Sequence, residues 1–266
     1  MSSVEIEVIG GGRMGTALLS GLVDSRWCAP EAMAVVELDA ARRASLSEEL
    51  PGVRVVAEPL EAPAAILAVK PADAESACRS LASLGAPVAR VVSIVAGTRT
   101  RAIESWVAPG TAVVRAMPNT PALVRAGVTA IARGSSASEQ DLAWAEEVMA
   151  KLGRVVRVGE DSLDAVTGLS GSGPAYVFVV VEALAEAGVM AGLPREVSEM
   201  LAVGTVVGAG RLLEQTGRSP EALRVEVTSP GGTTAAGLRA LEARAVRSAF
   251  MEAVVAATER SRELGR

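Results

Sequence analysis

Short apolar runs alternate with amphipathic segments through the first 160 residues of the chain. Each run is short enough for a strand, and the segments between the runs carry apolar residues mainly at helical spacing. An apolar run with few polar positions is typical of a parallel strand buried on both faces. The alternation therefore predicts a doubly wound α/β sheet. Its strands are expected at residues 4–9, 34–36, 54–56, 64–69, 90–95 and 111–116, and the runs at 127–132 and 154–158 could extend it.

The pattern changes near Gly159, where strands stop and helical periodicity takes over. We therefore predict a dinucleotide-binding Rossmann-type domain over residues 1–159 and an all-helical domain over residues 160–266. The helices of the second domain are expected at residues 163–169, 175–188, 196–213, 220–227 and 233–262.

Two acidic residues interrupt the first apolar run. Glu5 and Glu7 lie within residues 4–9, which should form a central strand. Glu5 fits the exposed start of that strand. The pattern gives Glu7 no clear place, because an unpaired carboxylate is costly to bury.

A glycine-rich turn follows the first strand. Gly10, Gly12 and Gly15 occupy its first, third and sixth places, with Gly11, Arg13 and Met14 between them. The first glycine permits a tight turn, the second a close approach to a pyrophosphate, and the third close packing of the following helix on the strand. The helix N-terminus would then face the anion. A purely structural glycine turn is the alternative.

An acidic residue ends the second predicted strand. Glu37 follows the last glycine of the turn by about twenty residues, the usual place of a carboxylate that binds the ribose hydroxyls of a dinucleotide. A solvated strand end would carry such a residue equally well, so both interpretations stay open for this position alone.

Composition excludes several kinds of chemistry. The chain has no histidine, and its only lysines are Lys70 and Lys151. Hydrolases with a histidine base, zinc sites with histidine ligands and histidine-dependent dehydrogenases are therefore excluded, and no metal site is expected. Tyr176 is the only tyrosine and lacks a lysine four residues later, so a tyrosine–lysine pair is excluded too. A net charge of −5 and 2% aromatic residues argue against nucleic-acid binding.

The longest apolar stretch lies in the second half. Residues 175–193 carry Glu182 and Glu186 on one helical face, which predicts a core or interface helix and no membrane span. The alanine- and glycine-rich helices are too apolar for a solvated surface and favour a subunit interface over a core within one subunit. Two cysteines and no apparent signal sequence point to a cytoplasmic protein.

Two further glycine turns precede helices, at residues 168–174 and 228–234. Such a turn leaves unpaired N–H groups and hydroxyls at a helix start, which can hold a carboxylate. A connector between packed helices is the plainer interpretation.

These motifs, with Val69-Lys70-Pro71, Ala96-Gly97 and the run from Met117 to Pro121, occur in the order found in pyrroline-5-carboxylate reductases, which the chain resembles over its whole length. The resemblance implies reduction of 1-pyrroline-5-carboxylate to L-proline by hydride from NADPH or NADH. It also implies self-association, either as a homodimer with interleaved helical domains or as a ring of such dimers.

The resemblance assigns roles to particular residues. The substrate would be held by Ser229, Gly231, Gly232, Thr233 and Thr234, with the Thr234 hydroxyl on the ring nitrogen as the catalytic contact. The dinucleotide would be lined by Gly10, Gly11, Gly12, Arg13, Met14, Gly15, Glu37, Ala68, Val69, Lys70, Pro71, Ala96, Gly97, Met117, Pro118 and Asn119.

The chain departs from the family pattern at two of these positions. Arg13 stands where many members have asparagine, and it either contacts phosphate or faces solvent. Glu37 replaces a small polar residue that accepts the 2′-phosphate of NADPH, and its carboxylate would repel that phosphate. We therefore expect a preference for NADH unless Arg42 or Arg43 compensates.

Three other interpretations stay open to different degrees. β-Hydroxyacid dehydrogenases share the domain order but need a lysine in the helical half, and no lysine follows Lys151. A reductase of a related cyclic imine differs only in pocket shape. A dinucleotide-binding sensor without activity would retain the first turn but has no need of the Ser229–Thr234 turn.

Overall fold

The computed structural model describes residues 3–265. The chain forms two compact units. The first contains Met1–Gly171 together with Ala256–Arg266, and the second contains Ser172–Val255. The domain boundary predicted at Gly159 stays a prediction. The boundary between the compact units lies after Gly171, and the end of the chain belongs to the first unit.

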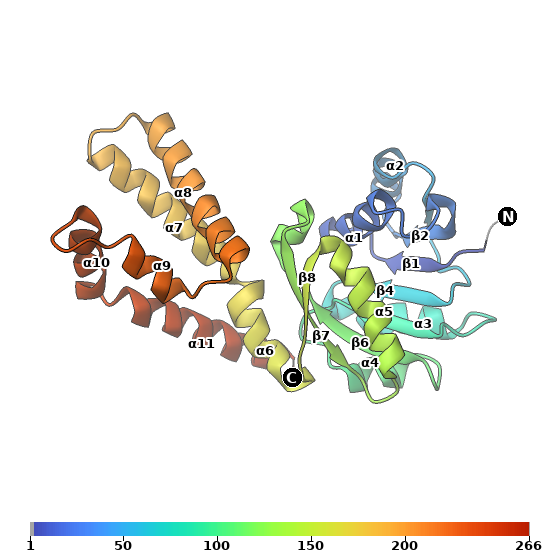
Figure 1. Ribbon diagram of the computed structural model, residues 1–266. Helices are drawn as coiled ribbons and strands as arrows, with labels where there is room; N and C mark the ends of the chain where they lie inside the picture. Colours follow the sequence, from blue (N-terminus) through green and yellow to red (C-terminus); the bar gives the residue numbers. More distant parts are fainter. Residues whose placement is uncertain (1–2, 266) are drawn as a thin grey trace. The chain divides into compact units, whose positions relative to one another are not determined.

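An eight-stranded sheet forms the centre of the first unit, in the order β3-β2-β1-β4-β5-β6-β7-β8 (Figure 1). All neighbouring strands are parallel except β6 and β7. This confirms the predicted doubly wound sheet, including its extension by the last two strands. The strands are β1 (Ile6–Ile9), β2 (Met33–Val36), β3 (Arg54–Val56), β4 (Ala64–Leu67), β5 (Arg90–Ser93), β6 (Ala112–Met117), β7 (Gly127–Arg133) and β8 (Gly153–Arg157).

Helices cover both faces of this sheet. Ile6 and Val8 point to a core completed by α1 (Arg13–Asp24), α2 (Ala40–Glu49) and α5 (Glu139–Met149). Ile9 points to the opposite core with α3 (Ala74–Ala82) and α4 (Thr100–Trp106). Successive residues of a strand thus pack into the cores on opposite faces of the sheet, which explains why the strands are apolar on both sides.

Glu7 is the exception within β1. Its side chain is fully buried and accepts a hydrogen bond from the Leu60 backbone N–H at 3.0 Å through Oε2. Its Oε1 is buried without a hydrogen-bond partner among the described residues. Burial raises the pKa of Glu7 to about 7, so the carboxyl group holds its proton at mildly acidic pH. The sequence pattern gave Glu7 no clear place, and the structure shows it as a buried carboxyl group with a raised pKa.

The second unit is helical. It contains α7 (Gly173–Met190), α8 (Arg195–Thr216), α9 (Pro220–Glu226), α10 (Thr233–Ala243) and the first half of α11 (Val246–Leu264), while the short α6 (Leu163–Val166) belongs to the first unit. The expected single helix over residues 233–262 is wrong, because the chain breaks between α10 and α11. Ala245 adopts a left-handed conformation there with φ of 53°, which ends a helix as glycine normally does.

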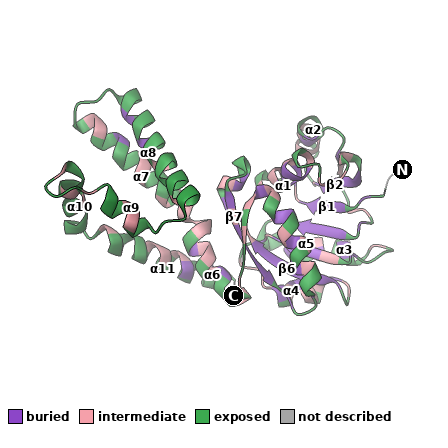
Figure 2. Cartoon of the chain, viewed as in Figure 1, coloured by how far each residue is buried: buried purple, intermediate pink, exposed green. Residues whose placement is uncertain are grey.

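Within the second unit α7 packs along α8. The Ser198 hydroxyl donates to the Ala185 carbonyl at 2.6 Å. A Cβ at Gly188 would lie 1.9 Å from Ser198 Oγ, so only glycine permits this approach. Other faces of the two helices are largely exposed, as the green colour of the α7 and α8 ribbons shows (Figure 2). Most apolar side chains of these helices are therefore not buried in a core within the single chain.

The segment Glu160–Met190 is long and apolar enough to cross a membrane by length and composition alone. Its most apolar window has a mean hydropathy of 1.4 and is only 6% buried within the single chain. Interface helices meet the same criterion, so it is weak evidence for a membrane span.

Candidate functional site

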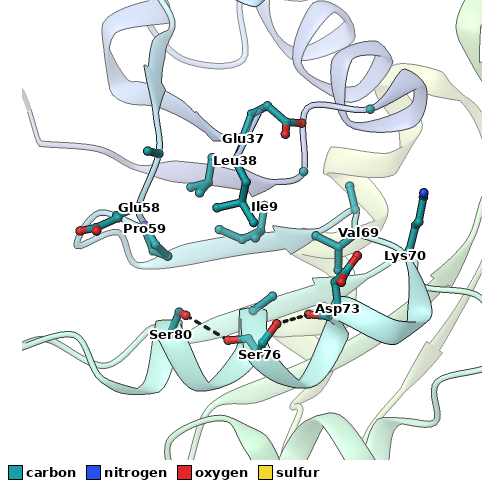
Figure 3. Close-up of a pocket in the computed structure, with 16 residues that line it drawn as sticks. Ile9, Glu37, Leu38, Glu58, Pro59, Val69, Lys70, Asp73, Ser76 and Ser80 are labelled. Atoms are coloured by element: carbon teal, nitrogen blue, oxygen red, sulfur yellow. Dashed lines mark hydrogen bonds between the residues drawn. The ribbon is translucent and has the colours of Figure 1, made fainter. Parts of the chain in front are cut away.

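A cleft of about 420 Å³ opens at the carboxyl ends of β1, β2 and β4 (Figure 3). This is the point where the strand order reverses, since β1 lies between β2 and β4. Ligands of open α/β sheets bind at such a crevice. Ten of the cleft residues were not identified as site residues from the sequence: Ile9, Val36, Leu38, Ala57, Glu58, Pro59, Asp73, Ser76, Ala77 and Ser80.

A sequence signal for part of this wall does exist. Ala57, Glu58 and Pro59 follow β3 directly, and the carboxyl ends of parallel strands meet at one edge of a sheet. The residues of α3 follow β4 in the same way, but which side of that helix faces the cleft depends on its packing.

The glycine turn has the geometry that a pyrophosphate site needs. Gly10 has φ of 110°, and a Cβ there would lie 2.6 Å from the Ala68 carbonyl oxygen. A Cβ at Gly15 would lie 2.0 Å from the Gly10 carbonyl oxygen, so a side chain would push α1 off the strand. Gly12 has open space around its Cβ position. The first and third glycines are thus required by the fold, while the middle one borders free space.

The N-terminus of α1 is available to an anion. Gly12 is its N-cap residue, and no side chain caps the first turn. The uncapped N–H groups and the positive end of the helix dipole favour a phosphate at this position. The residues present therefore fit the pyrophosphate of a dinucleotide.

Glu37 stands beside this turn. Its Oε2 accepts a hydrogen bond from the Gly11 N–H at 3.1 Å, and its Oε1 accepts one from the Asp39 N–H at 3.0 Å. The side chain is half-buried and lines the cleft with Leu38. A carboxylate fixed in this way leaves lone pairs for ribose hydroxyls.

Five of the other residues expected around the dinucleotide also line this cleft: Gly10, Gly12, Ala68, Val69 and Lys70. Gly11 and Gly15 are buried in the turn, and Met14 packs against the core. Arg13 is exposed and lines a different hollow with Thr16 and Arg42. Phosphate contact by Arg13 stays a prediction.

Another hollow, separate from that of Arg13, lies next to Pro71. Pro71, Ala96 and Gly97 line it together with Leu264 and Gly265 from the end of the chain. Gly97 has φ of 73°, and a Cβ there would lie 3.2 Å from the Leu264 carbonyl oxygen. The carboxyl end of α11 therefore supports the turn expected to face the nicotinamide.

The Met117-Pro118-Asn119 segment follows β6. Asn119 is buried, accepts a hydrogen bond from the Val128 N–H at 2.9 Å and donates one to the Ser170 carbonyl at 3.1 Å. Ser170 belongs to a single π-helical turn, Thr167–Gly171, a conformation frequent at functional sites. These bonds indicate that Asn119 has a structural role in this segment. Its predicted contact with the dinucleotide would be a second role.

The predicted substrate turn lies in the second unit. Gly231 has φ of 71°, and the Gly232 N–H donates to the Ser229 carbonyl at 3.0 Å. Gly232 is the N-cap of α10, which has no side-chain cap, and Thr233 and Thr234 are its first two residues. Both threonines are exposed. The turn thus presents uncapped N–H groups and two hydroxyls, as an anion site requires.

Comparisons with known proteins cover both parts of the chain. Residues 160–264 match the family model described as pyrroline-5-carboxylate reductase dimerisation. Residues 5–97 match the model described as NADP oxidoreductase coenzyme F420-dependent. The segment with membrane-like hydropathy therefore falls within a dimerisation domain.

Curated relatives and solved structures agree with these matches. The pyrroline-5-carboxylate reductases of a Synechocystis strain and of Methanosarcina acetivorans are 45% and 40% identical to the chain, over at least 99% of each protein. A solved structure of such a reductase from Coxiella burnetii has a TM-score of 0.92 at 35% identity and full coverage of both chains. The reductase of Plasmodium falciparum, solved with NADP bound, has a TM-score of 0.84 at 27% identity over both full chains. The chain belongs to the pyrroline-5-carboxylate reductase family.

Proposed function

We propose that the protein reduces 1-pyrroline-5-carboxylate to L-proline with hydride from NADPH or NADH, the last step of proline synthesis. The observation that carries this proposal is the presence of two uncapped glycine turns, at Gly10–Gly15 and Ser229–Thr234, in a chain related over its full length to reductases of that name. One turn suits a pyrophosphate and the other a substrate carboxylate.

The dinucleotide is proposed to lie along the carboxyl edge of the sheet. Its adenosine would occupy the cleft beside Glu37 and Leu38, and its pyrophosphate would rest on the N-terminus of α1. Val69, Lys70 and the segments at Ala96-Gly97 and Met117–Asn119 would border the nicotinamide. When bound, the dinucleotide supplies the hydride.

The substrate is proposed to bind at the Ser229–Thr234 turn. The N–H groups at the start of α10 would hold its carboxylate, and the Thr234 hydroxyl would contact the ring nitrogen. A cyclic imine is basic enough to arrive protonated, so hydride addition to the imine carbon gives the neutral amine without a histidine acid. Solvent then supplies the proton that completes the ammonium form. Orientation and exclusion of water are the protein's main contributions.

The chain self-associates through its helical part, as its membership of a family with a dimerisation domain requires. We further propose that dimers assemble into a ring and that the enzyme works in the cytoplasm. The exposed apolar side chains of α7 and α8 support the dimer. Light scattering of the purified protein would distinguish a dimer from a larger ring.

The reaction is tested by mixing the protein with 1-pyrroline-5-carboxylate and either NADH or NADPH. We expect the absorbance of the reduced nicotinamide to fall and proline to appear in equal amount. Reduction of a different cyclic imine in preference to this one would favour the related-imine reductase. Dinucleotide binding without consumption of any imine would favour the sensor.

A further inference from the structure

The lining of the cleft is rich in negative charge. Glu37, Glu58 and Asp73 line the cleft, and Lys70 is the only lysine or arginine among its lining residues within the described part of the chain. Figure 3 shows Lys70 beside Asp73, at the opposite end of the cleft from Glu58. A 2′-phosphate brings roughly two further negative charges to the ribose that Glu37 would contact.

Arg42 is one candidate to neutralise such a phosphate, because it and Glu37 both bond to Gly11. Its Nε donates to the Gly11 carbonyl at 2.9 Å, while Glu37 accepts from the Gly11 N–H. An arginine that reached the 2′-phosphate from this position would allow NADPH to bind despite Glu37.

The donors of Arg42 are already occupied. One terminal nitrogen donates to Glu49 Oε1 at 2.6 Å and to Ser45 Oγ at 3.2 Å. The other donates to Thr16 Oγ1 at 2.9 Å and to Glu49 Oε2 at 3.3 Å. With the bond to Gly11, all five N–H groups of the guanidinium have acceptors. Glu49 therefore holds Arg42 by a two-point contact, and both residues line the hollow of Arg13 and Thr16 instead of the cleft.

Arg43 is held as well. One of its terminal nitrogens donates to the backbone carbonyls of Glu37 and Leu38, both at 2.8 Å. These bonds fix the loop that carries Glu37. Neither arginine is among the residues that line the cleft.

We propose that the enzyme is selective for NADH, and that Glu49 sets this selectivity together with Glu37 by holding Arg42 away from the adenosine ribose. Glu37 binds the ribose hydroxyls and repels a 2′-phosphate, and Glu49 withholds the cation that would otherwise accept that phosphate. This inference rests on the proposed function, since it concerns the dinucleotide of that same site.

Binding of NAD⁺ and NADP⁺ to the full-length protein tests the proposal without any imine. Titration calorimetry should give NAD⁺ an affinity at least about tenfold higher than NADP⁺, because a like charge at contact distance disfavours the second ligand. Equal affinities, or tighter binding of NADP⁺, would overturn the proposal. Loss of imine reduction with this binding ratio intact would instead contradict the proposed function alone.

Variants test the roles of Glu37 and Glu49 separately. Glu37→Ser should weaken NAD⁺ and strengthen NADP⁺, and adding Glu49→Gln to it should raise the affinity for NADP⁺ a further several-fold by releasing Arg42. Glu48→Gln in the Glu37→Ser background is the matched control, because Glu48 is an exposed neighbour on α2 and loses the same charge. If the Glu49 and Glu48 variants shift NADP⁺ binding equally, Glu49 acts only through net charge and its proposed role is wrong. Melting temperatures of the variants check that α2 stays folded.

Discussion

The two units of the molecule use similar apolar side chains in opposite ways. In the first unit the large apolar residues of the central strands β1 and β4 are buried, as with Ile6, Ile66 and Leu67. In the second unit Phe178 and Met200 are 60% and 66% exposed, and many neighbouring aliphatic side chains are exposed with them. A monomer seldom exposes apolar surface on this scale. The first unit therefore completes its own core, whereas the second needs another chain to cover it.

A charge on the exposed face of α7 should disrupt the association of the second unit with its partner chain, and this is the largest effect that we expect. Phe178→Glu places a carboxylate where we expect a buried aromatic contact, and burying a phenylalanine contributes roughly 1.5–3 kcal/mol before the charge is counted. We expect the dimer dissociation constant to rise by at least about a hundredfold and imine reduction to fall with it.

Analytical ultracentrifugation over a dilution series, with activity measured on the same samples, checks this expectation. Phe178→Leu is the matched control, because it keeps an apolar side chain and should keep the dimer. An unchanged sedimentation profile of Phe178→Glu would mean that this face of α7 lies outside the interface.

Within the first unit, the glycine turn separates residues needed for folding from residues needed for binding. Gly15→Ala places a methyl group 2.0 Å from a backbone oxygen, so we expect a loss of about 2–4 kcal/mol of folding free energy. Gly12→Ala enters open space, so the fold should keep its stability while NADH binding weakens at least about tenfold. Urea unfolding and NADH fluorescence titration measure the two effects. Equal stability of both variants would contradict the contact assigned to Gly15.

The second unit offers the converse case, a residue whose substitution should affect catalysis alone. Thr234 is exposed at the start of α10, so Thr234→Val should leave the melting temperature nearly unchanged. Its kcat should fall by about 10–100-fold, because the hydroxyl that orients the ring nitrogen is lost. Thr234→Ser is the control that retains the hydroxyl and most of the rate. A Thr234→Val enzyme with full kcat would remove Thr234 from the catalytic site.

The sequence predicted the first unit better than the second for a physical reason. Buried parallel strands leave continuous apolar runs, and the turn after β1 needs glycine at defined places, so both leave local signals. The break at Ala245 left none, because neither glycine nor proline marks the left-handed residue. The same applies to the site: the contact of Arg42 with Thr16 joins side chains of two helices that meet only in the folded chain.

Glu7 is a buried acidic residue within the otherwise apolar strand β1, and its substitution is expected to have the smallest effect. Burial raises its pKa to about 7 from an ordinary value of 4.5. The native state therefore binds its proton more tightly than the unfolded state does. This contribution to stability is fully present below pH 4.5 and is lost as pH rises through about 7.

Glu7→Gln removes this titration while its amide oxygen can still accept the Leu60 N–H. We expect the variant to lose less stability than the unaltered protein between pH 4.5 and 7, by about 1–3 kcal/mol. Urea unfolding at a series of pH values measures the difference. Glu5→Gln is the control, since Glu5 is exposed at the start of the same strand. Parallel pH profiles for Glu7→Gln and the unaltered protein would show that Glu7 is ionised in the folded chain throughout this range, and hence that water or a counter-charge reaches Oε1.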